Sequence, residues 1–292
     1  MNWEETIVHL RSLADYQDIL RDSYLEEDLF ENANRFELSG EFKETLLTLK
    51  KYLPLGRKLL DVGAGNGIAT VAFARNGYIV AALEPDPSET VGAGAIRKLV
   101  DGLSLKEVAV VGATAEQMPF PDHSFDIVYV RQAMHHASHL KNFIKECARV
   151  LKPGGVLFTI RDHVVFDQND KQRCLQEHPL HKYYGGENAF SDPEYRSAMK
   201  DAGLDILLNL GHFESIINYF PQSPQDIANL PSIFKEQLNS RAARKYGIIG
   251  KFGPFRYIYR KAAAIKFGGA LDEKRIPGRL HSYIARKPNL SS

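Results

Sequence analysis

The chain has 292 residues, which is long enough for one large domain with an elaboration and a fully buried core. Charged residues make up 25% and hydrophobic residues 44%, the ordinary mix of a folded globular protein. The formal net charge of +1 gives no overall argument for binding nucleic acid or membranes, and no apolar run approaches the ~18 residues of a membrane span.

Two further features of the composition bear on the compartment. The first residues carry acids where a signal peptide needs a basic patch. Cys147 and Cys174 are too isolated for a disulfide framework or a zinc site. We therefore expect a cytoplasmic location and no metal site.

Apolar periodicity predicts the elements in chain order. Residues 1–54 form a predicted helical cap, with helical spacing in 6–20 and 42–53 and an end at Pro54. Short apolar runs then alternate with helical stretches, which predicts a parallel sheet covered by helices on both faces. The predicted strands are 58–62, 78–83, 107–111, 125–130 and 156–160. The predicted helices are 68–76, 92–100 and 140–151.

The pattern loosens after Arg161. Residues 162–188 are polar and rich in His and Tyr, so we expect an irregular connection that folds over the active site. A helix at 192–202, a strand at 204–210 and a final strand at 280–285 follow. The predicted organisation is a cap (1–54), a core (55–212), a helical basic insertion (213–276) and the last core strand (277–292).

A glycine-rich turn, Asp61-Val62-Gly63-Ala64-Gly65-Asn66-Gly67, follows the first predicted strand. Glycines there allow positive φ and close approach of a ligand at the carboxyl edge of the sheet. Ile68 stands where a dinucleotide fingerprint needs its third glycine, which disfavours a nicotinamide cofactor. Glu84 ends the next strand, where its carboxylate can accept hydrogen bonds from both ribose hydroxyls of an adenosine. This order predicts an adenosyl ligand across the strand ends.

Several segments carry a family resemblance. Asp61–Gly67 resembles motif I of class I S-adenosylmethionine-dependent methyltransferases, and Glu84 resembles their ribose-binding acid. Segments 112–128, 131–136 and 149–155 are similar to those of the ubiquinone/menaquinone-type (methyltransferase type 11) subgroup. The resemblance covers roughly residues 55–162. It implies a doubly wound, Rossmann-like α/β fold with a seven-stranded sheet whose last strand is antiparallel. It also implies S-adenosyl-L-methionine as cofactor and S-adenosylhomocysteine as product.

Positions matched to the family supply a candidate cofactor site. By this resemblance the loop glycines approach the methionyl part, residues 114–116 flank the adenine, and residues 131–132 line the sulfonium region. Thr114 stands where many relatives have an Asp that contacts the adenine amino group, so we expect altered adenine contacts. The cofactor-binding candidates are Asp61, Gly63, Ala64, Gly65, Gly67, Glu84, Pro85, Thr114, Ala115, Glu116, Arg131 and Gln132.

Methyl transfer is an in-line displacement, so the protein mainly aligns the nucleophile with the methyl group. A hydroxyl acceptor benefits from a general base, and histidine titrates in the right range. The candidate bases are His163, then His136, with His181 from the polar connection. In the alternative reading, His136 or its neighbour His135 caps the next helix. A metal bound by residues 178 and 181 has no acidic cluster to support it.

The insertion contains a run of positive charge. Residues 241–266 hold Arg and Lys at eight positions without one acid, interleaved with Phe and Tyr. This segment is a lid that recruits an anionic sugar- or lipid-linked substrate, a surface for anionic membranes, or a solvated helical face. Nucleic acid ranks lower, because the chain has no Asn-Pro-Pro-Tyr-like pocket for a flipped base.

The sequence therefore predicts an enzyme that transfers a methyl group to a small-molecule or lipid- or sugar-linked acceptor, with oxygen as the expected methylated atom. Two alternatives stay open. One is a non-catalytic protein that binds an adenosyl ligand, and the other is a nicotinamide-dependent oxidoreductase. The pattern does not indicate the acceptor or the oligomeric state.

Overall fold

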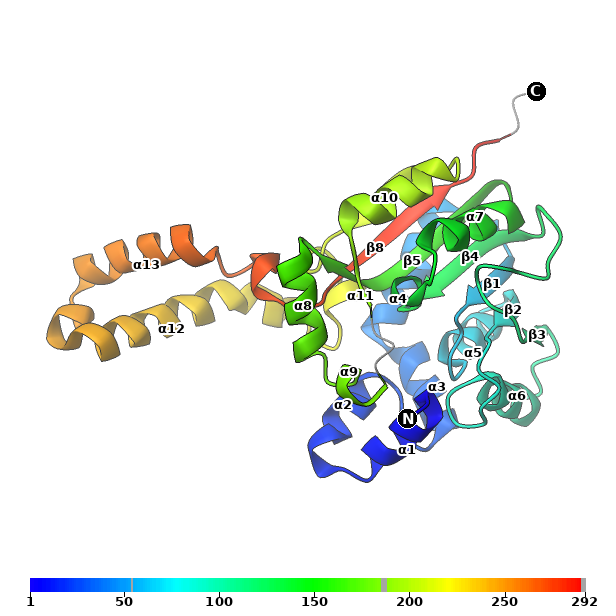
Figure 1. The fold of residues 1–292 in the computed structure, drawn as a ribbon, viewed down its shortest axis with the longest axis horizontal. Coiled ribbons are helices and arrows are strands. Elements are labelled where there is room, and N and C mark those ends of the chain that lie inside the picture. Colours follow the sequence, from blue (N-terminus) through cyan, green and yellow to red (C-terminus); the bar gives the residue numbers. More distant parts are fainter. Residues whose placement is uncertain (54, 185–187, 290–292) are drawn as a thin grey trace.

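A mixed sheet forms the centre of the computed structural model, which describes residues 1–53, 55–184 and 188–289 (Figure 1). Its strand order is β3-β2-β1-β4-β5-β8-β7, with β6 beside β5. Only β8 runs antiparallel to its neighbours among the described strands. The strands are β1 (Lys58–Val62), β2 (Ile79–Leu83), β3 (Val108–Val111), β4 (Phe125–Arg131), β5 (Leu151–Val165), β6 (Phe190–Ser191), β7 (Asp205–Leu210) and β8 (Arg279–Arg286). The predicted α/β sheet with an antiparallel last strand is confirmed, and β6 is a short eighth strand that the periodicity did not indicate.

Helices cover both faces of this sheet because its strands are apolar on both sides. In β1, Leu59 packs into one apolar cluster and Leu60 into another, as alternate side chains of a strand must. One face is covered by α3 (Leu29–Leu38), α4 (Gly40–Tyr52), α5 (Ile68–Arg75) and α6 (Ala93–Gly102). The other is covered by α7 (Leu140–Val150) and α10 (Asp192–Asp201).

The N-terminal cap contains more breaks than its periodicity suggested. The apolar stripe at 6–20 is divided between α1 (Trp3–Arg11), η1 (Ala14–Tyr16) and α2 (Gln17–Asp22). The turn after α4 begins at Leu53, and Pro54, where that helix was predicted to end, lies outside the described residues.

The expectation of an irregular connection at 162–188 is wrong. Strand β5 continues to Val165, and α8 (Gln168–Glu177) and α9 (His181–Tyr184) follow. The Asp167 carboxylate caps α8 by accepting the backbone N–H of Asp170, and Cys174 is buried on the inner side of this helix. Most of the helix surface is exposed, so its composition resembles that of a loop. Glu187 of this segment lies outside the described residues.

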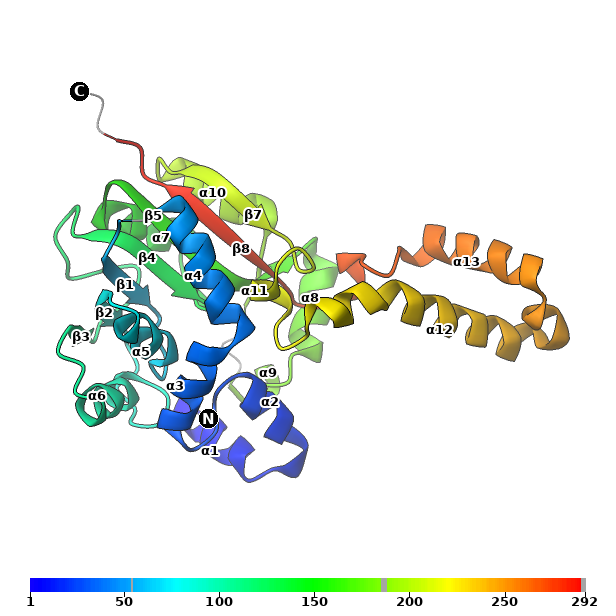
Figure 2. The same ribbon diagram turned by 180° about the vertical axis from the view of Figure 1, so that it is seen from behind.

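The insertion is helical, as predicted, and forms an arm that projects from the core (Figures 1 and 2). It contains α11 (Ile216–Tyr219), α12 (Pro224–Lys251), α13 (Gly253–Phe267) and η3 (Glu273–Arg275). Helices α12 and α13 lie side by side and point away from the sheet. Within the described residues, no helix combines the length and apolar character needed to span a bilayer.

Candidate active site

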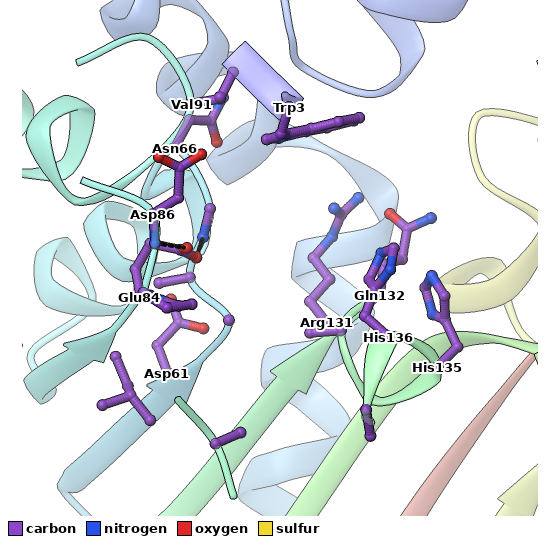
Figure 3. A pocket seen from close by; sticks show the side chains of 18 of the residues that line it. Trp3, Asp61, Asn66, Glu84, Asp86, Val91, Arg131, Gln132, His135 and His136 are labelled. Atoms are coloured by element: carbon purple, nitrogen blue, oxygen red, sulfur yellow. Dashed lines mark hydrogen bonds between the residues drawn. The ribbon is translucent and has the colours of Figure 1, made fainter. Parts of the chain in front are cut away.

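A cavity of about 470 Å³ lies at the carboxyl ends of the parallel strands. Its lining includes the loops after β1 and β2, residues 113–116, the segment 131–138 and His163 of β5. Trp3 of α1 and Tyr184 of α9 complete the wall from outside the sheet, with their ring centroids 5.4 Å apart. Figure 3 shows that carboxylates and imidazoles occupy opposite sides of this cavity. Within the part of the chain that the structure describes, no residue of α12 or α13 lines this cavity.

The loop after β1 depends on two of its glycines. Gly63 and Gly65 have φ of 66° and 54°, a region that L-residues with side chains rarely adopt. A Cβ on Gly63 would lie 2.5 Å from Cβ of Ala133, so this loop packs tightly against the loop after β4. A Cβ on Gly65 would meet only the carbonyl oxygen of Val91, at 3.9 Å. The loop therefore leaves free space beside Gly65, on the cavity wall.

Glu84 joins the loops after β1 and β2. Its Oε2 accepts the backbone N–H of Gly65 at 2.7 Å, and its Oε1 accepts that of Asp86 at 2.9 Å. Burial raises the pKa of Glu84 to about 7 despite these bonds. Asp61 lies deeper, accepts the hydroxyl of Thr70 at 2.6 Å, and has a pKa that burial raises to about 6. Each Glu84 oxygen keeps a second lone pair, so this carboxylate can still accept bonds from a ligand.

Arg131 holds a buried ion pair on the opposite wall. Its Nε and Nη2 donate to the two carboxylate oxygens of Glu41, in the first turn of α4, at 2.6 and 3.1 Å. Nη1 of Arg161 lies 3.6 Å from the same carboxylate. Burial opposes the charge on Glu41, but the two guanidinium groups outweigh it and lower the pKa of Glu41. This network fastens α4 to the ends of β4 and β5.

Four imidazoles gather beyond Arg131, where η2 (Met134–His136) follows β4. The ring centroids of His135 and His136 are 4.1 Å apart, and those of His135 and His163 are 4.7 Å apart. His163 in turn contacts His178, at 5.4 Å. Nδ1 of His135 donates to Oδ1 of the fully buried Asp162 at 3.0 Å, and the backbone N–H of His135 donates to the same oxygen. Asp162 therefore fixes both the position and the tautomer of His135.

The backbone is strained at this wall. Gln132, directly after β4, has a φ of 50°, and Arg161, within β5, has a φ of 59°. Such conformations cost on the order of 1–3 kcal/mol each and persist where the surrounding structure imposes them. Here they turn the chain so that Gln132 lines the cavity and Arg161 reaches Glu41.

The cavity brings together most of the residues predicted from the sequence. All cofactor candidates except Gly67 line it, as do His136 and His163. Gly67 instead starts α5 with φ of 85°. His181 does not line the cavity, and its neighbours His178 and Tyr184 are the members of that segment that do. Glu116 lines it while accepting the backbone N–H of Ser138 at 3.0 Å.

Sequence reasoning missed several residues of the site. Trp3, Glu41 and the partner role of Asp162 had no local motif to indicate them. Asp162 was detectable in principle, because it follows the predicted strand 156–160 as His135 follows the predicted strand 125–130, and these adjacent parallel strands run to the same edge of the sheet. No group of three or more His, Cys, Asp or Glu side chains suited to a metal ion occurs in the part of the chain that the structure describes.

Comparisons with known proteins agree with this geometry. Residues 60–159 match a family described as "Methyltransferase domain". The chain is 28% identical over 178 residues to a ubiquinone biosynthesis O-methyltransferase of Agrobacterium fabrum, which covers 58% of this chain and 68% of the relative. It is also 34% identical over 172 residues to a sterol 24-C-methyltransferase of Yarrowia lipolytica. This match covers 56% of the present chain and 43% of that relative.

The fold is also similar to that of a solved geranyl diphosphate C-methyltransferase from Streptomyces coelicolor, in complex with Mg²⁺, geranyl diphosphate and S-adenosyl-L-homocysteine. That likeness has a TM-score of 0.57 and 14% identity and covers 97% of both chains. The matches to the curated relatives span between 36% and 68% of those proteins. The family match runs from β1 into β5 and includes the glycine loop and Glu84. Residues 60–159 are therefore similar to a methyltransferase domain, and the sheet has the fold of class I S-adenosylmethionine-dependent methyltransferases.

Proposed function

We propose that this protein transfers a methyl group from S-adenosylmethionine to a hydroxyl oxygen of a small-molecule or lipid- or sugar-linked acceptor. The observation that carries the proposal is that two different groups of residues line opposite sides of the cavity. The glycine loop and Glu84 lie on one side, and the imidazoles of His135, His136 and His163 lie on the other (Figure 3). The residues of the first side would hold the cofactor, and the imidazoles of the second side would lie toward its methyl group.

The residues on the first side suit an adenosyl ligand. The free space beside Gly65 admits a close approach to the backbone, and the Glu84 carboxylate retains lone pairs for two ribose hydroxyls. When bound, the sulfonium of the cofactor supplies a methyl group to a nucleophile aligned in line with it. Thr114, Ala115 and Glu116 line the same cavity, in the place proposed for the adenine.

The residues on the second side suit proton removal from the acceptor. With Nδ1 of His135 donating to Asp162, its Nε2 is the atom that takes the proton, and the buried carboxylate stabilises the resulting imidazolium. His163 is held in the same tautomer, because its Nδ1 donates to the carbonyl oxygen of Gly278 at 2.8 Å. We assign His135 as the base, because its Nδ1 donates to the buried carboxylate of Asp162, which stabilises a protonated ring.

The wall between the two sides indicates the acceptor class. Trp3, Leu25, Leu180 and Tyr184 offer an aromatic and apolar surface from α1, the segment after α2 and the region of α9. This surface suits a largely apolar acceptor body with a hydroxyl directed at the imidazoles. The relative from Agrobacterium fabrum is named as an O-methyltransferase, which agrees with this choice, whereas the sterol relative is named for carbon methylation.

The test is methyl transfer from S-adenosylmethionine with a labelled methyl group to paired acceptors. Each pair consists of an apolar hydroxyl compound and the same compound without the hydroxyl. We expect label only in the hydroxylated member, on oxygen when the product is examined by NMR. Label on carbon would overturn the choice of oxygen. Cofactor binding without transfer to any acceptor would favour a non-catalytic adenosyl-binding protein.

Replacement of Glu84 by Gln is expected to weaken the cofactor complex. The amide keeps the size of the side chain but loses the charge that accepts the ribose hydroxyls, and a hydrogen bond to a charged group contributes about 1.5–3 kcal/mol. The Kd for S-adenosylhomocysteine, measured by calorimetry, should therefore rise by about 10- to 100-fold. Glu89→Gln is the matched control, because Glu89 is exposed and pairs with Lys98. Equal affinities of both variants would remove Glu84 from the cofactor site.

The same carboxylate should make cofactor binding depend on pH. Its pKa is raised to about 7, and the ribose hydroxyls need the ionised form as acceptor. Affinity is therefore full above pH 7 and falls as the pH drops below that value. We expect the Kd for S-adenosylhomocysteine to be about tenfold higher at pH 6 than at pH 8. The ratio of wild-type to Glu84→Gln affinity isolates this effect from titration of the ligand, and a constant ratio would contradict the prediction.

A further inference from the structure

The outer end of the helical arm exposes a group of large apolar side chains. We call residues 244–258 the arm tip. Ile248 is 88% exposed, Ile249 64% and Phe252 65%. These residues surround the bend between α12 and α13, at the end of the arm that lies far from the core (Figures 1 and 2). Scattered exposed hydrophobic residues are normal, but a contiguous group at a protruding end marks an interaction surface.

The arm tip is a folded structure rather than a frayed helix end. The element α12 is kinked at Gly247, whose φ of 57° and ψ of −130° are not helical, and a Cβ on Gly250 beyond this kink would clash with the carbonyl oxygen of Ala242 before it. The ring of Tyr246 packs edge-on against those of Phe255 and Tyr259, with centroids 5.1 and 6.0 Å apart. The exposed apolar side chains are therefore presented in a fixed arrangement.

The charge around these side chains has one sign. Residues 241–266 contain eight Lys or Arg and no acid, in a chain with a formal net charge of only +1. Arg244, Lys245 and Lys251 next to the bend are exposed. Near an anionic bilayer, each such cation strengthens binding about fivefold. Apolar side chains that enter the interface beside cations are the composition of a membrane-surface anchor.

We propose that the arm tip docks on an anionic lipid bilayer. Ile248, Ile249 and Phe252 enter the interface, and the neighbouring cations lie among the headgroups. The phosphates of a nucleic acid would contact the cations, but they would not bind the protruding aliphatic side chains. Among the described residues, none of α12 or α13 lines the cavity. This proposal holds independently of the methyl acceptor.

Co-sedimentation of the full chain with vesicles tests the proposal. We expect binding to phosphatidylcholine vesicles that contain phosphatidylglycerol, little binding to phosphatidylcholine alone, and weakening at high salt. The apolar variant Ile248→Ser/Ile249→Ser/Phe252→Ser should bind at least about tenfold more weakly. The charge variant Arg244→Glu/Lys245→Glu should lose at least as much affinity for the vesicles.

Matched controls come from the exposed positions of α4, a helix of the core that lies far from the arm tip. Leu47→Ser removes an apolar side chain that is 63% exposed, and Lys43→Glu/Lys50→Glu reverses two exposed cations. Both should bind like wild type. Binding of S-adenosylhomocysteine verifies that every variant is folded.

Insertion itself is measurable by fluorescence, because Trp3 is the only tryptophan. In a Trp3→Phe background, Phe252→Trp should shift its emission to the blue with anionic vesicles only. The proposal would be overturned if the wild-type chain did not bind vesicles. It would also be overturned if the apolar variant bound them as well as wild type, because the binding would then arise from charge attraction alone. Self-association in light scattering that the apolar variant abolishes, without vesicle binding, would assign the arm tip to a second copy of the chain.

Discussion

Replacing His135 by Gln should lower kcat for the proposed methyl transfer by about 10²–10⁴-fold, because glutamine cannot take the acceptor proton. The glutamine amide can still donate to Asp162, so the wall of the cavity should keep its shape. Affinity for S-adenosylhomocysteine should stay within about twofold of wild type, since the contacts of Glu84 lie on the opposite side. Steady-state kinetics and calorimetry separate the two effects.

Two further substitutions distinguish the role of His135 from its neighbours. Asp162→Asn should lower kcat by a comparable factor, because an amide at this position favours the wrong tautomer of His135 and cannot stabilise its charge. The acid limb of the wild-type pH–rate profile should also be lost in His135→Gln. If His163→Gln or His136→Gln abolishes that limb while His135→Gln preserves it, the base is not His135.

Replacing Glu41 by Gln should destabilise the fold by about 3–5 kcal/mol, the usual effect of breaking a buried ion pair. The change leaves Arg131 and Arg161 without their shared carboxylate, and Nε of Arg161 already has no hydrogen-bond partner among the described residues. The melting temperature should fall by about 10 °C, and the urea midpoint should decrease with an unchanged slope.

The matched control for Glu41 is Glu37→Gln. Glu37 also pairs with an arginine, Arg75, but both side chains are partly exposed, so the loss should stay below about 1 kcal/mol. Since the pKa of Glu41 is lowered, its stabilisation is present above its ordinary value of 4.5 and is lost as the pH falls through the folded-state pKa. The difference in the free energy of unfolding between wild type and Glu41→Gln should therefore become smaller at acidic pH. Equal losses for the two substitutions would show that the buried network contributes no more than a surface pair.

Most of the sheet could be predicted because its strands follow a local rule. Runs of apolar residues bounded by turns placed β1 at 58–62, as observed, and located β2, β3, β4, β7 and β8 to within one residue at each end, whereas β5 extends five residues beyond its predicted range at each end. Helix α8 was missed for the opposite reason. Its buried side is narrow, so hydrophobic periodicity is weak, and its cap at Asp167 is the main local signal.

The side of the cavity proposed for the cofactor could be assembled from the sequence because its residues are close together in the chain, whereas the opposite side could not. Gly65 and Glu84 both belong to one strand–helix–strand unit. Glu41 and Arg131 are joined across 90 positions, and only the packing of α4 on the sheet brings them together. The same holds for Trp3 and Tyr184, whose contact depends on where α9 ends.

The contact between Trp3 and Tyr184 lies outside residues 60–159, the segment that matches the methyltransferase family. The glycine loop and Glu84 lie within the matched segment, whereas this part of the cavity wall comes from α1 and α9. Changes in either segment can alter which molecule is accepted without disturbing the glycine loop. With the acceptor bound against this wall as proposed, exchange of α1 between relatives should change which acceptor is methylated while cofactor affinity is kept.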